Sequence, residues 1–374
     1  MSRVLVVDHE PPQASRDGGS ARMMTMLRLL RDECHAVSFA SQRPWPSDTA
    51  AAEQPLIRLG VAVVARDGAV ANWLCSNGAD LDIVIASRLP VAQAVLPLTR
   101  RHCPDARFFY DATHVEHLAK FRLAKLTGNR PLLVAALQDR AAEQDVVAAA
   151  DGAFAASDED ANELRALVAD AQVYRLPAVE VAVRSDEARQ PRSGIVFLGF
   201  LRMPENEIAV RRLVDGVWPR VEAELGPSPL TVIGADPPEW LVKAARKQPG
   251  LVVTGHLADI HQALHAAAVF VVPLIGGSGV KTKVLQAFAH HVPVVATTDG
   301  LRGVPAIDEV HVLRAESDAE LAAATVRILR DPDLGRALAR RAADAMPESF
   351  DSNLDRATMR KAVGPALEIG AHDD

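Results

Sequence analysis

Short apolar runs alternate with longer segments of helical periodicity along most of the chain. The run Arg3–Asp8 is rich in β-branched residues, and residues 21–32 carry apolar side chains at helical spacing, so this stretch predicts a strand, a loop and a helix. Further strands are expected in the first half at residues 36–40, 61–64, 83–86, 107–110 and 153–156. Alternation of this kind is typical of a parallel sheet covered by helices on both faces, so an α/β fold is expected.

The pattern lapses around residues 179–193, which are polar and aperiodic and indicate a linker between domains. After it the alternation begins again, which predicts two Rossmann-like, doubly wound domains facing each other across a cleft. The domains expected are 1–180, a linker at 181–194, 195–345, and a C-terminal helix and tail at 346–374 that could cross back to the first domain. Within the second half, strands are expected at 195–198, 230–233, 251–254, 269–273 and 292–297. Helices are expected at 207–225, 240–247, 260–267 and 283–290, and the last stretch, 317–363, is also expected to be helical.

The composition is that of a globular protein, with 374 residues, 49% of them hydrophobic and 24% charged. The net charge of -7 gives no general attraction for nucleic acid, and no nucleic-acid partner is expected. The three cysteines form no CxxC pair, which favours buried thiols in a reducing cytoplasm. The longest apolar run, residues 266–275, is shorter than the roughly 18 residues of a membrane-spanning helix, so a cytoplasmic protein is expected.

A glycine-rich loop with two lysines follows the expected strand at 269–273. Glycine lets backbone amides approach a ligand closely, and the start of the next helix supplies partial positive charge. Lys281 and Lys283 add two full positive charges. The loop therefore predicts a diphosphate site, and its place after an expected buried strand favours that site over the alternative of a flexible loop with two solvated lysines. The loop at 297–303 follows the next strand and could contact the same ligand or be a plain turn.

A second glycine pair, Gly18 and Gly19 followed by Ser20, precedes the first predicted helix. These residues could bind an anionic oxygen at the helix start, and a plain turn would look the same. The pair lacks both the GxGxxG order and the GxxxxGK[ST] order, which disfavours a dinucleotide or ATP-hydrolysing domain.

Several stretches in order along the chain resemble family 4-type glycosyltransferases of the GT-B fold, also described as glycosyl transferases group 1. In the second half they are Phe197-Leu198-Gly199, Pro204 with Asn206, residues 255–259, 273–274, 279–285 and 293–297. In the first half they are Val7-Asp8-His9, residues 16–20, Tyr110-Asp111 and Ser157.

The resemblance implies transfer of a sugar from a nucleotide diphosphate donor to a surface-glycan or lipid-linked acceptor, without metal or cofactor and with retention of anomeric configuration. In that interpretation Lys281 and Lys283 neutralise the departing diphosphate, and the backbone of Gly255 to Leu257 holds the base. The donor-side residues implied are Gly18, Gly19, Ser20, Gly199, Asn206, Gly255, His256, Leu257, Gly277, Ser278, Gly279 and Gln286.

Three positions depart from the family pattern. Gln286 stands where a glutamate commonly binds the donor ribose, His290-His291 stands where a small residue and glycine are usual, and Met203 stands where histidine is frequent. An amide keeps one acceptor but lacks the charge. Two alternatives therefore stay open: a catalytically silent scaffold or nucleotide-binding protein, and a nucleotide-sugar epimerase, for which no carboxylate pair is identified.

Polar residues after the expected strand at 107–110 are candidates for the acceptor side. His117 could orient or deprotonate an acceptor hydroxyl, with Asp111, His114 and Arg122 nearby in sequence. No third metal ligand is identified here, and no metal site is expected. Residues 117–130 have basic and leucine residues typical of an amphipathic helix that could touch anionic lipid at the inner membrane face, or present a solvated face.

Overall fold

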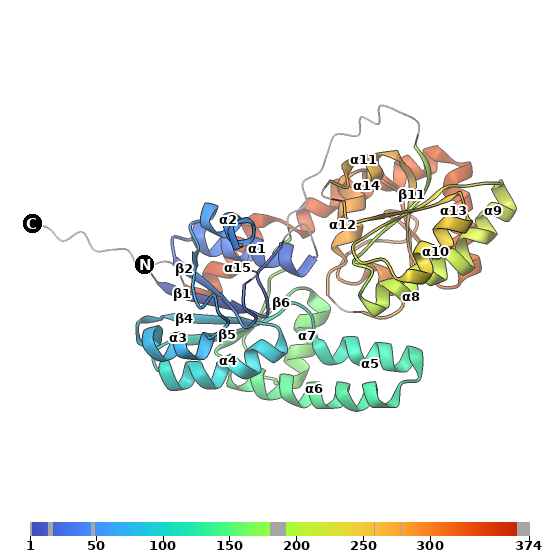
Figure 1. Ribbon diagram of the computed structural model, residues 1–374. Helices are drawn as coiled ribbons and strands as arrows, with labels where there is room; N and C mark the ends of the chain where they lie inside the picture. Colours follow the sequence, from blue (N-terminus) through green and yellow to red (C-terminus); the bar gives the residue numbers. More distant parts are fainter. Residues whose placement is uncertain are drawn as a thin grey trace, which may run out of the picture. The chain divides into compact units, whose positions relative to one another are not determined.

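The computed structural model describes residues 2–13, 18–45, 49–179, 192–257, 259–277 and 279–364 (Figure 1). The chain divides into two compact units. The first contains Met1–Val179 and Asp351–Asp374, and the second contains Glu180–Phe350. Most of the expected linker, 181–194, lies outside the described residues, but Ser193 and Gly194 belong to a strand of the second unit.

The first unit is built on a seven-stranded sheet in the order β3-β2-β1-β4-β5-β6-β7, and every neighbouring pair is parallel. This confirms the α/β class expected from the alternation. The expected strand at 61–64 contributes only two paired residues. The strands are β1 (Arg3–Asp8), β2 (Ala36–Ser41), β3 (Ala62–Val63), β4 (Ile83–Ser87), β5 (Arg107–Ala112), β6 (Gly152–Ala155) and β7 (Val173–Arg175).

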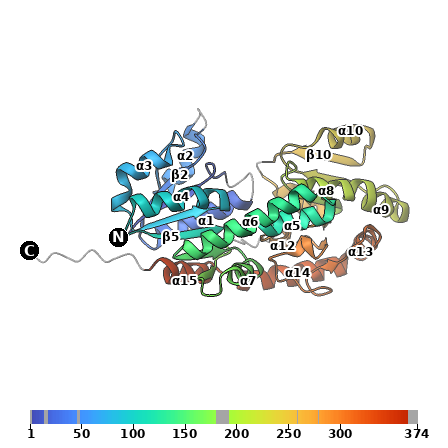
Figure 2. The same cartoon turned by 90° about the horizontal axis from the view of Figure 1, so that it is seen from below.

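Helices cover both faces of this sheet (Figure 2). They are α1 (Gly18–Asp32), α2 (Thr49–Arg58), α3 (Val70–Asn77), α4 (Leu89–His102), α5 (Glu116–Thr127), α6 (Arg130–Ala149), α7 (Asp158–Leu167) and, from the end of the chain, α15 (Ser352–Val363), with a 3-10 turn at Gly78–Asp80. Strand β1 shows why two layers are needed, because Val4 and Val6 pack into one core and Leu5 and Val7 into the other.

The single helix expected at 117–130 is wrong. Gly128 takes a left-handed conformation, with φ +66°, and ends α5, since glycine adopts this backbone without steric strain. Helix α6 then starts at Arg130, and the Asn129 side chain caps it by accepting a hydrogen bond of 3.0 Å from the Leu132 N–H. The result is a hairpin of two antiparallel helices.

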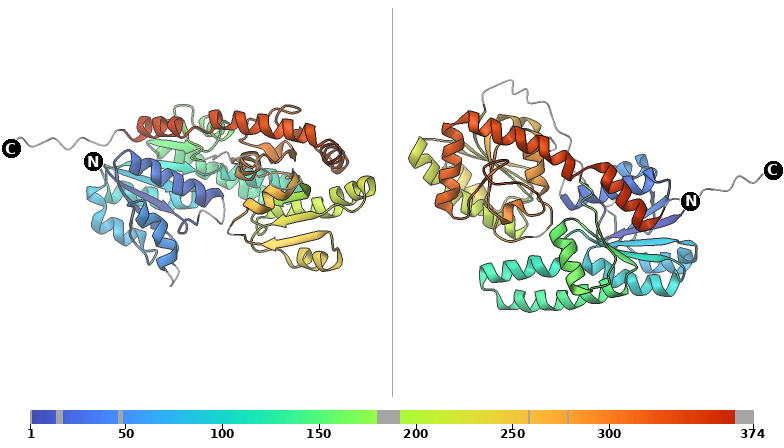
Figure 3. Two further views of the ribbon diagram at one scale, coloured as in Figure 1. Left: turned by 90° about the horizontal axis from the view of Figure 1, so that it is seen from above. Right: turned by 180° about the vertical axis from the view of Figure 1, so that it is seen from behind.

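Helix α15 closes the first unit from the far end of the sequence (Figure 3). Met359, Ala362 and Val363 are buried in the same core as α1. Arg360 forms a two-pronged ion pair with Glu33, at 2.7 and 3.0 Å. The Asp355 carboxylate accepts a hydrogen bond of 3.0 Å from the Ala178 N–H. These contacts fix both the register and the direction of α15 on the sheet.

The second unit has a six-stranded parallel sheet in the order β10-β9-β8-β11-β12-β13. Its strands are β8 (Ser193–Leu198), β9 (Leu230–Ile233), β10 (Leu251–Gly255), β11 (Ala267–Val272), β12 (Val294–Ala296) and β13 (Leu313–Arg314). Its helices are α8 (Pro204–Arg212), α9 (Trp218–Leu225), α10 (Glu239–Lys247), α11 (His261–Ala266), α12 (Thr282–Ala289), α13 (Asp318–Arg330) and α14 (Pro332–Ser349), with a 3-10 turn at Asp299–Leu301.

Two expected helices are divided. The segment 207–225 is interrupted by a π-helical turn, Leu213–Val217, which precedes Pro219 and accommodates the proline that lacks an N–H. The segment 317–363 is broken at Asp331-Pro332 and again at Asp351, where each aspartate caps the helix that follows.

In each sheet the strand order reverses direction at one place. In the second unit the chain runs outward from β8 through β9 to β10, and on the other side from β11 through β12 to β13. The loops after β8 and β11 therefore leave in opposite directions at the carboxyl ends of these strands, which is the place where ligands of open α/β sheets bind. In the first unit the equivalent place lies between β1 and β4.

Candidate functional site

The reversal point of the second unit gathers a glycine, an asparagine and a lysine. Gly199 follows β8, and a side chain there would place its Cβ only 2.8 Å from the Lys283 Nζ and 3.0 Å from the Asn206 Oδ1. A side chain at position 199 would therefore displace the Lys283 ammonium or the Asn206 amide. The Gly199 N–H bonds the Ile233 carbonyl at 3.0 Å, which ties this turn to β9.

Lys283 is held by neutral groups. Its Nζ donates a hydrogen bond of 2.6 Å to the Asn206 Oδ1 and lies 4.8 Å from the centre of the Phe197 ring. Burial of the ammonium, with the nearby charge of Lys281, lowers the pKa of Lys283 to about 7, although Glu205 acts in the opposite direction. An anionic ligand here would restore the charged form of Lys283.

Lys281 lies at the N-terminus of α12 and is 8% exposed. Its Nζ is 3.4 Å from the Gly279 carbonyl, and a Cβ on Gly277 would lie 3.3 Å from the same Nζ. Gly276, Gly277 and Gly279 all have positive φ, between 70° and 84°, so side chains would strain this loop. Two lysines and the positive end of a helix thus converge where the chain leaves β11.

The loop after β12 braces the glycine loop. The Asp299 carboxylate accepts a hydrogen bond of 2.6 Å from the Gly276 N–H and pairs with Arg302 at 2.7 Å. The Arg302 carbonyl in turn accepts a hydrogen bond of 3.2 Å from the Lys281 N–H. The sequence allows either a ligand contact or a plain turn at residues 297–303. In the structure these residues hold the glycine loop in place.

The end of β10 lies at the same edge of the sheet, beyond β9. Gly255 has φ +71° and open space on its side-chain side, and its carbonyl accepts a hydrogen bond of 3.0 Å from the Gly234 N–H. His256 is exposed and Leu257 is half-buried. A planar ligand could approach this backbone without displacing a side chain.

Gln286 lies on α12 one turn beyond Lys283, and its side chain is exposed. The backbone carbonyl of Gln286 accepts a hydrogen bond of 2.7 Å from the Nδ1 of His290. The other ring nitrogen of His290, Nε2, lies 2.9 Å from the Nδ1 of His261. The histidine that departs from the family pattern is therefore part of the packing between α11 and α12. Ser278 lies outside the described residues.

The expected polar residues of the first unit are engaged by other residues of the same unit. Asp111, at the end of β5, is fully buried, and its carboxylate accepts hydrogen bonds from Arg22 at 2.6 Å and Ser87 at 2.7 Å. The neighbouring pair, Arg88 with Asp8, is 2.9 Å apart at the reversal point between β1 and β4. Gly18 and Gly19 begin α1 and are half-buried, and Ser20 is buried.

Both ring nitrogens of His117 contact carboxylates. The Nδ1 is 2.5 Å from Glu143 and the Nε2 is 3.1 Å from Glu163, and His117 is buried, with 4% of its surface exposed. Burial lowers the pKa of His117, but the two carboxylates outweigh it, so the pKa is raised. His114 lies 2.8 Å from Glu116. Arg122 pairs with Glu159 at 2.5 Å. In this arrangement His117 ties α5 to α6 and α7.

Of the residues expected from the sequence, the structure brings six together: Gly199, Asn206, Gly277, Gly279, Lys281 and Lys283. Gln286 and residues 255–257 lie on the same unit. The other unit contains Asp111, His114, His117 and Arg122. The sequence singled out Phe197 as part of a motif but did not predict its contact with Lys283, and it did not single out Glu205 beside Gly277. It also missed Arg22 and Arg88. For Arg22 and Arg88, the signal in the sequence is a charged residue that directly follows an apolar strand or faces the end of one.

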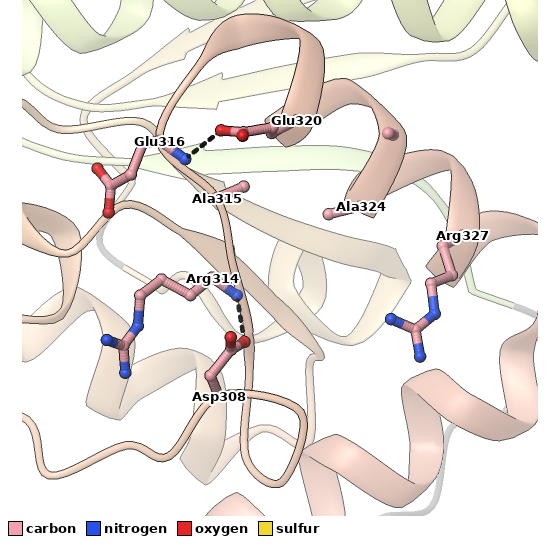
Figure 4. A pocket seen from close by; sticks show the side chains of 8 residues that line it. Asp308, Arg314, Ala315, Glu316, Glu320, Ala324 and Arg327 are labelled. Carbon is pink, nitrogen blue, oxygen red and sulfur yellow. Dashed lines mark hydrogen bonds between the residues drawn. The ribbon is translucent and has the colours of Figure 1, made fainter.

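A shallow pocket of the second unit lies apart from these residues, beside β13 and α13 (Figure 4). The Glu320 carboxylate there accepts a hydrogen bond of 3.1 Å from the Glu316 N–H, and Asp308 accepts one of 2.7 Å from the Arg314 N–H. Its charged groups serve a helix cap and a turn.

Across the described residues, no three His, Cys, Asp or Glu side chains are arranged to hold a metal ion. None of the described helices has the length and apolar character for crossing a bilayer.

Comparisons with known proteins agree on the architecture. TarM of S. aureus, in a complex of a mutant with fondaparinux, α-GlcNAc-glycerol and UDP, superposes with a TM-score of 0.76 at 8% identity, over 97% of this chain and 100% of that chain. Sucrose-phosphate synthase of Thermosynechococcus elongatus gives 0.74 at 16% identity, over 96% and 98%. HepE of Anabaena, in complex with UDP, gives 0.70 at 13% identity, over 97% and 99%.

The fold is GT-B. Residues 192–331, which make up most of the second unit, match the family model of Glycosyl transferases group 1. A search among curated proteins finds no match. In the GT-B chain described here, Lys281, Lys283 and Gly199 lie within the segment that matches the family model, and the buried ion pair of Asp111 with Arg22 lies outside it.

Proposed function

We propose that this GT-B protein is a glycosyltransferase that takes a sugar from a nucleotide diphosphate donor. The observation that carries the proposal is the convergence of Lys281, Lys283 and the N-terminus of α12 at the reversal point of the second sheet. A diphosphate bound there meets two cations and the positive end of a helix. When the sugar leaves, negative charge grows on the diphosphate, and preorganised cations stabilise that charge.

Each element of the site has a task in this proposal. Lys281 and Lys283 contact the diphosphate, and Asn206 with Gly199 positions Lys283. The open backbone at Gly255 to Leu257 accepts the base. Gln286, exposed one turn beyond Lys283, receives a ribose hydroxyl through its amide. The matching family and the UDP in the structures of TarM and HepE support this donor class.

The finer assignments are proposals on the same footing. We infer a retaining, metal-independent transfer of a hexosyl or deoxyhexosyl group of the family 4 type to a surface-glycan or lipid-linked acceptor. The acceptor side belongs to the first unit, near Asp111, His114 and Arg122. Because both ring nitrogens of His117 are engaged by carboxylates, we assign it a positioning role for α5.

The test is a thermal-shift screen of the purified protein against UDP, GDP, dTDP, CMP and their sugar adducts, with EDTA present, followed by detection of released nucleotide. A ligand that binds only the folded state raises the melting temperature. A shift with one diphosphate and slow donor hydrolysis are expected. Binding without hydrolysis or transfer would favour the silent nucleotide-binding protein, which the exposed amide of Gln286 motivates. Dependence of activity on added metal would contradict the metal-independent mechanism.

A further inference from the structure

Exposed apolar side chains are concentrated on the α5–α6 hairpin. The described chain has eleven large hydrophobic residues that are exposed, and five of them fall between residues 121 and 137. Val134 and Leu137 are 55% and 58% exposed. The five are Phe121, Leu126, Leu133, Val134 and Leu137.

These residues share one stretch of the hairpin. On α6, Leu133, Val134 and Leu137 are spaced for one helical face. The ion pair of Lys120 with Asp139 sets the antiparallel register of the two helices. This register places Leu126 level with Leu133 and places Phe121 beside the turn that contains Leu137. The inward face is occupied by other residues, Ala124, Ala136, Val146 and Val147, so the exposed set is not required by the core.

The same stretch carries a local excess of positive charge. Residues 118–140 contain five cations, Lys120, Arg122, Lys125, Arg130 and Arg140, and one anion, Asp139, in a chain whose net charge is -7. Lys120 and Arg122 are paired with carboxylates. Lys125, Arg130 and Arg140 are exposed and form no ion pair with any described residue.

We propose that this surface docks on a bilayer containing anionic phospholipid. The hairpin patch, defined as the five apolar residues above with Lys125, Arg130 and Arg140, combines side chains that enter the acyl boundary with cations that remain at the headgroups. Helix α6 supplies Leu133, Val134 and Leu137 with Arg130 and Arg140, and α5 adds Phe121, Leu126 and Lys125. The end of the hairpin projects beyond the sheet of the first unit (Figure 1).

A second copy of the chain is a poorer occupant. A two-fold symmetric interface through the hairpin patch would bring two surfaces of the same positive sign together, and facing surfaces of like charge are unfavourable. The lipid assignment extends the proposed function, because it names how a lipid-linked acceptor would be reached, but the docking itself does not depend on sugar transfer.

The experiment is co-sedimentation of the full chain with vesicles of phosphatidylcholine alone, and with vesicles that contain about one quarter phosphatidylglycerol. Wild-type protein is expected to bind the anionic vesicles at least tenfold more strongly, and added salt is expected to weaken this binding. The double substitution Leu133→Ser with Leu137→Ser, and the triple substitution of Lys125, Arg130 and Arg140 to Gln, are each expected to reduce binding at least tenfold.

Matched controls come from the second unit. Val252→Ser with Ile307→Ser removes two exposed apolar residues, and the Gln triple at Arg246, Lys247 and Arg340 removes three exposed cations. Both controls are expected to bind vesicles as wild type does. Nucleotide-induced thermal shifts, measured in parallel, are expected to be unchanged in the hairpin variants, so a failed donor site and a failed membrane surface are told apart.

Three outcomes would overturn the proposal. The first is wild-type protein that stays in the supernatant with both kinds of vesicle. The second is equal loss of binding in the hairpin variants and in the controls. The third is a lipid-free dimer, seen by sedimentation equilibrium, that Leu137→Asp dissociates while vesicle binding is absent; this would assign the patch to a second copy.

Discussion

The two sheets have the same reversal of strand order, but charge is arranged differently at the two reversal points. In the first unit, Arg22 meets the buried carboxylate of Asp111 and Arg88 meets Asp8. In the second unit, Lys283 meets an amide oxygen and an aromatic ring, and its pKa falls to about 7. Charges in the first unit neutralise one another within the fold, whereas the second unit holds a cation whose charge is poorly compensated.

The charges at the reversal point of the first sheet stabilise the fold, whereas those at the reversal point of the second sheet suit the binding of a ligand. A buried cation with a carboxylate partner has little to gain from an added anion. A lysine held by neutral groups gains its charged form when an anion arrives. The same topology can thus carry a scaffold on one side and a site on the other, and substitutions at the two places are expected to affect different properties.

The largest effect is expected from Arg22→Met, which leaves the Asp111 carboxylate buried without its cation. Removing one partner of a buried ion pair lowers the free energy of unfolding by about 3–5 kcal/mol. Urea unfolding checks this, with Arg58→Met, at an exposed position on α2, as the control. Equal stability of the two variants would show that the Arg22 pair is not structural.

Lys281→Ala is expected to act on turnover rather than on stability. Loss of one preorganised charge at the departing diphosphate reduces turnover by about 10²–10³-fold. Donor hydrolysis or transfer is the measurement, and Lys243→Ala, an exposed lysine on α10, is the control. Unchanged turnover in Lys281→Ala with an unchanged melting temperature would remove the diphosphate from this loop.

Asp355 differs from Asp111 within the first unit, because neighbouring groups only partly offset the cost of burying the charge of its carboxylate. Burial raises its pKa from 3.8 to about 6 despite the Ala178 hydrogen bond, Arg175 and Arg22. Its contribution to stability is therefore complete below about pH 4 and is lost as pH rises through 6. Asp355→Asn is expected to raise the free energy of unfolding at pH 7.5 by about 1–3 kcal/mol relative to wild type, and to have little effect at pH 4.

Urea unfolding of both proteins across this range is the measurement. A difference between wild type and Asp355→Asn that does not change with pH would contradict the assignment of the titration to this carboxylate.

Lys283 predicts a pH dependence of donor affinity. Because its pKa is about 7 in the free protein, the charged fraction falls as pH rises above 7, and affinity for an anion falls with it. We expect about a tenfold loss between pH 6.5 and 8.5. A sugar nucleotide is the suitable ligand in titration calorimetry, since a terminal phosphate would itself titrate near pH 6. Lys283→Met should bind weakly at every pH, and a retained slope in that variant would assign the titration elsewhere.

Gln286→Glu is expected to have the smallest effect. A carboxylate accepts a hydrogen bond from a ribose hydroxyl more strongly than an amide does, by about 1 kcal/mol or roughly fivefold in affinity. Calorimetry with the donor identified in the screen measures it. Weaker binding in Gln286→Glu would indicate a donor that prefers the amide.

Much of the fold is readable from local pattern. The run Arg3–Asp8 is apolar on both faces, so it predicts β1 with its observed bounds, and residues 230–233 do the same for β9. Gly128, followed by an asparagine cap, carries a helix stop that a leucine-rich composition concealed. The division of 207–225 depends on the backbone's response to Pro219, which periodicity does not register.

The site is only partly readable. The glycine loop and its lysines stand out because they follow an apolar run, and the resemblance supplied Gly199 and Asn206. Their contact with Lys283 requires β8 to lie beside β11, and an alternating pattern does not specify strand order. For the same reason the pair of Asp8 with Arg88, 80 residues apart, is invisible until the order of β1 and β4 is known.

The crossing of α15 has a consequence for synthesis on the ribosome. Residues 2–179 are made before the second unit, yet α15, which packs with α1 into the core on the Val4 and Val6 side of their sheet, is translated only after the whole second unit. Domains generally fold as they are completed. The second unit, which is continuous in sequence, can therefore reach its native state first, while the core on the Val4 and Val6 side of the earlier-made sheet is completed only when residues 352–363 arrive.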